Sequence, residues 1–177
     1  RQRWADISGI STEQDFVEAP SQLLEEWSWD TATLQTFAKH WQTNQPIPDE
    51  LVAKMRAARD FGKGLQVRQQ MFYAKLSLSL YDRDPHGLNT TETVKAIQNK
   101  YGKFHYIDGT SMQTSFGHLD GYSAVYYTYM WSLVIAKDLF SKFDQKHLLD
   151  PRTAIAYRKA VLDQGGSDKA ANLVKNF

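Results

Sequence analysis

The sequence of 177 residues is notable first for what it lacks. It contains no cysteine, which excludes disulfides, catalytic thiols, zinc fingers and iron–sulfur clusters. It has almost no net charge, since 21 lysines and arginines face 20 aspartates and glutamates. A near-neutral chain lacks the basic surface that captures nucleic acid or anchors a protein to an anionic membrane. We therefore expect no nucleic-acid partner.

Long apolar runs and short catalytic motifs are absent as well. The stretch with the fewest charges, residues 119–136, contains Asp120 and four tyrosines, so no membrane span is expected. There is no HExxH, no G-x-S-x-G and no phosphate-binding loop. Gly62-Lys63-Gly64 is too short for a phosphate loop. The five histidines do not have the spacing of metal ligands; these are His40, His86, His105, His118 and His147.

The composition and the residue pattern predict an all-α protein. Hydrophobic residues make up 42% of the chain and aromatic residues 13%, enough for a packed core. No run alternates apolar and polar residues, so a sheet is poorly supported. We expect one helical domain of about seven to eight helices over residues 1–177. The expected helices cover residues 16–27, 30–41, 49–61, 65–81, 90–101, 122–143 (the longest) and 150–164.

Two further features of this helical pattern bear on function. Residues 103–121 form the longest stretch without a period and contain three glycines, and a loop of that length is usually functional or mobile. Lys54, Arg56 and Arg59 have the spacing of a solvated helix face.

The lack of cysteine does not decide the cellular compartment, since it is compatible with both cytoplasm and periplasm.

Glu18 is the first residue that could carry chemistry. It stands among apolar neighbours on a segment that must bury one face. A buried carboxylate needs a cation, hydrogen-bond donors or a metal to compensate its charge. The alternative is a surface glutamate, on a polar side that Glu25 and Glu26 would share, because charged residues are seldom fully buried.

A row of tyrosines is the second such feature. Tyr122, Tyr126 and Tyr129 are spaced i, i+4 and i+7, so on a helix their rings would share one face. Such a row usually packs in a core. It can also line a cleft with phenolic donors, which suit the stabilisation of a developing oxyanion, and His118 just before the row could donate too.

Two ordered motifs in this chain resemble the thimet oligopeptidase/neurolysin family of zinc peptidases. The first motif is Asp15-Phe16-Val17-Glu18-x-Pro20-Ser21-Gln22. The second is Phe116-Gly117-His118-Leu119-x-Gly121-Tyr122, continued by Tyr126-Tyr127-x-Tyr129-x-Trp131. The start, Arg1-Gln2-Arg3-Trp4 with Ser8-Gly9, is similar to the dipeptidyl carboxypeptidase branch of that family. The resemblance extends through the whole chain to Gly165-Gly166-Ser167.

The resemblance implies a helical, two-lobed peptidase with a deep channel that admits short, unstructured peptides. Such enzymes hold one zinc through the two histidines of HExxH and a later glutamate, and the glutamate of HExxH is the general base. Glu18 matches the later zinc ligand. Tyr129, with His118, matches the group that stabilises the tetrahedral intermediate. The residues that match substrate-binding positions are Gly117, His118, Gly121, Tyr122 and Tyr126.

The chain departs from the family pattern in two places. The missing HExxH would lie just before Arg1, so we expect the chain to be the C-terminal part of a catalytic domain, truncated just after that motif. Its partner would then be the N-terminal remainder of the same polypeptide, and the chain alone would lack zinc and activity. The loop is also one glycine shorter than usual, since only Gly121 precedes Tyr122.

Three functions remain open at this stage. The parent protein could be a zinc endopeptidase that cleaves short peptides, or a dipeptidyl carboxypeptidase that uses the same chemistry. The third possibility is a helical binding module without catalysis, with Glu18 at the surface and the tyrosines in the core. The surroundings of the tyrosine hydroxyls discriminate between catalysis and binding.

Overall fold

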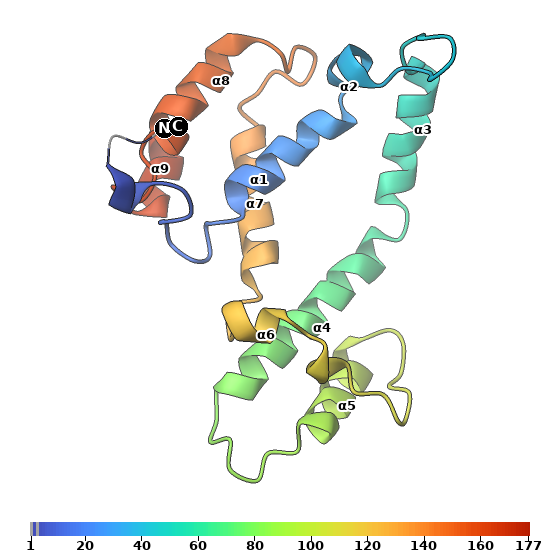
Figure 1. The fold of residues 1–177 in the computed structure, drawn as a ribbon, viewed down its shortest axis with the longest axis vertical. Coiled ribbons are helices and arrows are strands. Elements are labelled where there is room, and N and C mark those ends of the chain that lie inside the picture. Colours follow the sequence, from blue (N-terminus) through green and yellow to red (C-terminus); the bar gives the residue numbers. More distant parts are fainter. Residues whose placement is uncertain (1, 3) are drawn as a thin grey trace. The chain divides into compact units, whose positions relative to one another are not determined.

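The computed structural model describes residue 2 and residues 4–177, and the described chain is helical (Figure 1). Within this part the only pairing of strand type is an isolated bridge between Lys39 and Pro46. The all-α prediction is therefore confirmed. None of the described helices is both long and apolar enough to cross a membrane. Arg1 and Arg3, which carry part of the dipeptidyl carboxypeptidase resemblance, lie outside the described residues.

Nine α-helices occur in the described chain, one more than the upper expectation. They are α1 (Ala19–Leu24), α2 (Thr31–Phe37), α3 (Asp49–Asp60), α4 (Lys63–Tyr81), α5 (Thr90–Tyr101), α6 (His118–Gly121), α7 (Thr128–Phe140), α8 (Pro151–Tyr157) and α9 (Ala170–Asn176). Short helical turns accompany them: η1 (Ala5–Ile7), η2 (Glu25–Trp29), η3 (Met112–Thr114) and the π-helical η4 (Arg158–Leu162).

The helix predicted over residues 122–143 is wrong in its first part. The helix α7 begins only at Thr128, and α4, with 19 residues, is the longest. The cause is a turn around Ser123, which has a φ of 43°. A residue in this left-handed region interrupts an α-helix. Tyr122, Tyr126 and Tyr129 have helical spacing in the sequence, but the turn separates Tyr122 from the other two.

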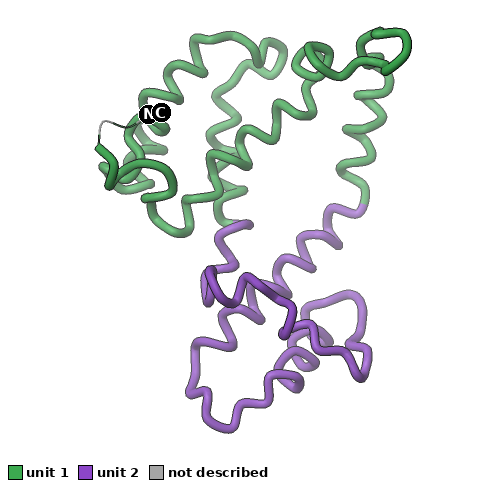
Figure 2. The backbone as a smooth tube through the Cα atoms, viewed as in Figure 1, with its two compact units in different colours: residues 1–61, 131–177 green, residues 62–130 purple. Residues whose placement is uncertain are grey.

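The chain divides into two compact units (Figure 2). Unit 1 contains residues 1–61 and 131–177, and unit 2 contains residues 62–130. Unit 1 has an apolar core from α1, α7, η4 and α9, with Phe16, Leu23, Leu139, Val161 and Leu173 buried in it. Their burial removes apolar surface from water, which is the main stabilising term for such a unit.

Unit 2 is organised around α4 and α5. Phe72 and Leu76 of α4 pack with Val94 and Ile97 of α5 in a second core. Asn89 caps α5, since its side chain accepts a hydrogen bond from the Glu92 N–H at 3.1 Å. This pair of helices forms the support on which the predicted loop, residues 103–121, and the tyrosine segment lie.

Candidate functional site

The segment from Gly117 to Tyr129 in unit 2 carries all but one of the predicted site residues. It begins with the short helix α6, turns at Ser123 and continues into α7. Gly117, His118 and Gly121 are exposed, Tyr122 and Tyr129 are half-buried, and Tyr126 is buried. The fold therefore gathers these residues from a helix, a turn and the start of another helix.

His118 and Tyr129 are hydrogen-bond partners. The His118 Nε2 atom lies 3.2 Å from the Tyr129 hydroxyl, and the tautomer of the imidazole sets which group donates. The two rings meet edge-on, with centroids 5.6 Å apart. This contact joins the exposed helix α6 to the first turn of α7. It places two polar groups together at a partly open surface.

Tyr122 completes this group on one side. Its ring stacks on that of Tyr129, with centroids 5.4 Å apart and planes inclined by 26°. It also contacts the His118 ring at 5.7 Å. The sequence analysis expected Tyr122 and Tyr129 to share a helix face. They do lie together, although a turn brings them there.

Tyr126 differs from the other two tyrosines because it belongs to the core. Its side chain is only 7% exposed and contacts the rings of Tyr73 and Phe116. Its hydroxyl donates to the Gln70 side-chain oxygen at 3.1 Å. Burial, with smaller contributions from Tyr73 and Tyr129, raises the pKa of Tyr126 despite that hydrogen bond. Tyr126 therefore stays a neutral phenol, packed directly beneath His118 and Tyr129.

One face of α4 holds this segment, and the sequence analysis missed it. Gln70, Tyr73, Ser77 and Tyr81 are spaced i, i+3, i+7 and i+11, so they line one side of the helix. Ser77 and Tyr81 donate hydrogen bonds to the backbone carbonyls of Ser123 and Leu119. The recognisable signal was a second, partly polar stripe beside the apolar one that contains Phe72 and Leu76.

Glu18, the predicted zinc ligand, lies in unit 1 at the N-terminal end of α1. Its side chain is half-buried, and the Ser21 hydroxyl lies 3.5 Å from its Oε2 atom. Pro20 stands in the first turn of α1, where its missing N–H costs nothing. No group of three or more histidine, aspartate or glutamate residues is gathered for a metal in the described residues. A carboxylate is nevertheless a normal zinc ligand.

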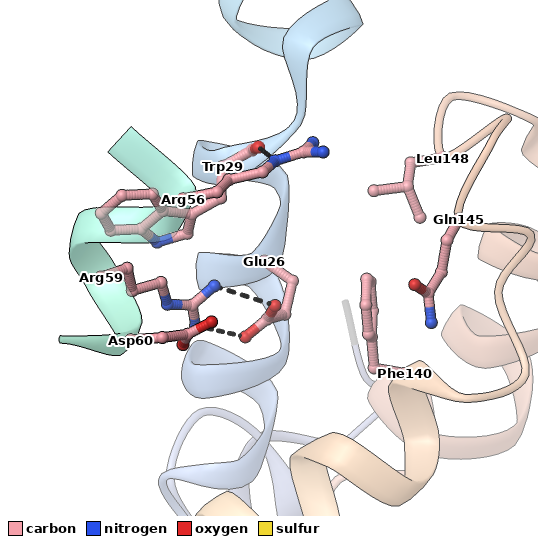
Figure 3. A pocket seen from close by; sticks show the side chains of 8 residues that line it. All are labelled: Glu26, Trp29, Arg56, Arg59, Asp60, Phe140, Gln145 and Leu148. Atoms are coloured by element: carbon pink, nitrogen blue, oxygen red, sulfur yellow. Dashed lines mark hydrogen bonds and ion pairs between the residues drawn. The ribbon is translucent and has the colours of Figure 1, made fainter. Parts of the chain in front are cut away.

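A pocket of about 230 Å³ in unit 1 is lined by Arg59 and Glu26, two charged residues named in the sequence analysis (Figure 3). Arg59 was expected on a solvated face, but both of its terminal nitrogens bind the Glu26 carboxylate, at 2.7 and 3.2 Å. Glu26, which the alternative for Glu18 placed on a shared polar side, has a side chain that is only 10% exposed. Arg59 also lies over the Trp29 ring, 4.9 Å from its centroid. Glu26 and Arg59, two of the charged residues that line this pocket, are thus paired with each other.

The family follows from a comparison with known proteins. A family model described as Peptidase family M3 matches residues 1–177, the whole length of the chain. The chain belongs to peptidase family M3. The matched range includes the motifs around Glu18 and His118.

Proteins similar to this M3 chain include peptidases with different names. It is 32% identical to Oligopeptidase A of Escherichia coli over 98% of its own length and 26% of that protein. It is 29% identical to the human Mitochondrial intermediate peptidase, covering 25% of it, and 30% identical to the Escherichia coli Dipeptidyl carboxypeptidase, covering 27%. The chain spans about a quarter of the length of these relatives.

Proposed function

We propose that the protein containing this chain hydrolyses short peptides as a zinc metalloendopeptidase. In this proposal the chain is the C-terminal part of the catalytic domain and contributes Glu18 to the zinc and His118 and Tyr129 to the transition state. The observation that carries the proposal is the 3.2 Å contact between His118 and Tyr129 on an exposed, glycine-flanked segment. Membership of a peptidase family supports it.

The hydrogen bond between His118 and Tyr129 suggests a separate role for each residue. When the imidazole carries its proton on Nε2, His118 donates to the phenolic oxygen of Tyr129. In the proposed reaction the Tyr129 O–H donates to the oxygen that becomes negative as a peptide carbonyl is attacked. The hydrogen bond from His118 makes the phenol a better donor. Preorganised donors of this kind stabilise the transition state more than the bound substrate.

Glu18 has the chemistry of a zinc ligand, and the rest of the ligand set lies elsewhere in the proposal. Zinc accepts a carboxylate oxygen together with imidazole nitrogens. When bound, zinc polarises the scissile carbonyl and activates a water molecule. The described residues gather no set of three ligands, so two histidines would come from the remainder of the polypeptide. Half-burial of Glu18 suits a ligand that must be shielded from bulk water.

Substrate binding involves the surface around this pair. Gly117 and Gly121 flank His118 without side chains, so an extended peptide can approach the backbone there. Tyr122 offers an aromatic face beside Tyr129. Tyr126 also matches a substrate-binding position, but its burial and the hydrogen bond from its hydroxyl to Gln70 favour a structural role instead. A purely structural role suits Tyr126 alone, because His118 is exposed and Tyr122 and Tyr129 are only half-buried.

Replacing Tyr129 by phenylalanine tests the proposal. The change Tyr129→Phe removes one hydroxyl and keeps the ring that stacks on Tyr122. In the full-length protein we expect kcat for a short peptide to fall by about 10²–10³ with little change in KM, because an oxyanion donor acts in the transition state. Steady-state kinetics with an internally quenched fluorescent peptide measures both constants.

The matched control is the neighbouring tyrosine. Tyr127 is 42% exposed and has no place in the proposed site, so Tyr127→Phe should leave kcat and KM within about two-fold. A Tyr129→Phe protein that binds peptide less well but turns it over at the normal rate would refute the proposed role of Tyr129.

A further inference from the structure

Ser77 occupies an unusual position on α4. It is fully buried, with 0% of its surface exposed, although its neighbours in the unit 2 core are apolar. Its hydroxyl makes two contacts with the site segment: it donates to the Ser123 carbonyl oxygen, and it lies 3.5 Å from the Tyr126 N–H, which donates to it. A buried hydroxyl whose donor and acceptor capacities are both engaged fixes the groups around it.

These two contacts fall on the turn that shapes the site. Ser123 has a φ of 43°, a left-handed conformation that is costly for a residue with a side chain. Such a conformation persists only where the surroundings hold it. Ser77 is hydrogen-bonded to this turn at two points, the carbonyl of Ser123 and the N–H of Tyr126, three residues further along.

The conformation of this turn also sets the distance between the two proposed catalytic groups, His118 and Tyr129. His118 precedes Ser123 by five residues, and Tyr129 follows it by six. The Tyr126 ring, whose backbone N–H binds Ser77, contacts both His118 and Tyr129, at centroid distances of 5.0 and 5.1 Å. A shift of this turn would therefore move His118 relative to Tyr129.

We infer that Ser77 is a positioning residue, which holds the turn at Ser123 so that His118 and Tyr129 stay in register for the proposed reaction. The inference rests on the proposed function for its kinetic consequence. Its structural part, the restraint of the turn at Ser123 by the Ser77 hydroxyl, stands on the hydrogen bonds alone.

The test compares Ser77→Ala with Ser79→Ala in the full-length protein. The two serines lie two residues apart on α4 and are equally buried, but the Ser79 hydroxyl has no hydrogen-bond partner. Each substitution removes one oxygen atom and adds none. Ser77→Ala should lower kcat about 10-fold or more with KM nearly unchanged, because a small misplacement of catalytic groups affects the transition state most. Ser79→Ala should leave both constants within about two-fold.

A double variant separates positioning from general damage. If Ser77 acts through Tyr129, then adding Ser77→Ala to a Tyr129→Phe protein should cost much less than it costs the wild-type protein. Equal losses in both backgrounds would overturn the inference. If Tyr129→Phe itself has no effect on kcat, the proposed function fails and not the inference.

Hydrogen exchange tests the structural part without activity. Peptides covering residues 118–127 should exchange at least several-fold faster in Ser77→Ala than in Ser79→Ala, since only the first variant loosens the turn. Exchange in α5 should match between the two variants. Unchanged protection of residues 118–127 in Ser77→Ala would overturn the inference whatever the kinetics show.

Discussion

At the scale of single residues, two glycines near the C-terminus pack against the start of the chain. Gly165 has a φ of 55°, and a Cβ atom there would lie 1.9 Å from the Ile7 carbonyl oxygen. At Gly166 a Cβ atom would lie 1.8 Å from the Ser11 carbonyl oxygen, and the Gly166 N–H donates to Ile7 at 2.9 Å. Both neighbours are backbone atoms, which cannot swing aside as a side chain can. This close approach explains the paired glycines of the Gly165-Gly166-Ser167 motif.

The first stability prediction concerns this contact. Gly165→Ala should lower the free energy of unfolding by about 2–4 kcal/mol, since it combines a backbone clash with an unfavourable φ. Gly64→Ala is the control, because Gly64 lies in α4 with no atom within 4 Å of the added Cβ. It should be neutral or stabilise by up to about 1 kcal/mol. Urea unfolding followed by circular dichroism measures both, and equal effects would contradict the packing role.

At the scale of elements, Glu26 joins three helical segments of unit 1. It lies in η2 and binds Arg59 of α3 and Lys137 of α7, the latter at 2.6 Å. Burial on its own raises the pKa of Glu26, but the hydrogen bonds from Arg59 and Lys137 outweigh burial and hold the pKa below its usual value of 4.5. A largely buried carboxylate with two cationic partners holds η2, α3 and α7 in a defined position, because charge-assisted hydrogen bonds are directional and apolar packing is not.

Glu26→Gln should therefore destabilise the protein by about 1–3 kcal/mol at neutral pH, because it leaves Arg59 and Lys137 without their anion. Glu50→Gln removes a partner of Lys54 in an exposed pair, with side chains 79% and 71% accessible. That control should cost no more than about 0.5 kcal/mol. Thermal unfolding of the two variants and the wild-type protein measures both losses of stability. Equal losses in the two variants would contradict the prediction.

The same ion pairs predict a pH dependence. Since the folded-state pKa of Glu26 is lower than its unfolded value, its charge stabilises the protein fully above about pH 4.5 and loses that effect as the pH falls through the folded pKa. The gap in stability between the wild-type protein and Glu26→Gln should narrow from pH 7 towards pH 3. A gap independent of pH would show that shape, and not charge, matters at this position.

At the scale of the whole molecule, the chain covers about a quarter of its relatives, and its candidate metal ligand is a single carboxylate. A lone carboxylate binds zinc weakly, whereas a catalytic zinc site needs three protein ligands. The zinc site in the proposed function is therefore a property of the full-length protein. Glu18 would complete it from this part of the sequence.

Glu18→Gln in the full-length protein should lower zinc affinity by well over the roughly 10–100-fold that loss of an outer-shell partner costs. Glu25→Gln, at an exposed position in the next helical turn, should leave zinc affinity unchanged. The isolated 177-residue chain should neither retain zinc through dialysis nor cleave peptides. Metal analysis after dialysis measures zinc content, and full retention by Glu18→Gln would remove Glu18 from the ligand set.

Much of this protein could be read from residue types and spacing. The absence of alternating strands, the start of α8 at Asp150-Pro151 and the break at Gly62 depend on local backbone preferences, which a sequence displays directly. The two motifs around Glu18 and His118 identified the family because residue identity at fixed spacing is a property of the chain itself.

Only the tertiary structure decided which of these residues are buried and what they contact. Tyr122, Tyr126 and Tyr129 look equivalent in the sequence, yet only Tyr126 enters the core, because the turn at Ser123 replaces the expected helix. In the sequence, Ser77 and Glu26 are ordinary polar residues. In the structure, they bind partners that are distant along the chain. Burial and hydrogen bonding across long separations depend on how elements pack, and local pattern carries no record of that packing.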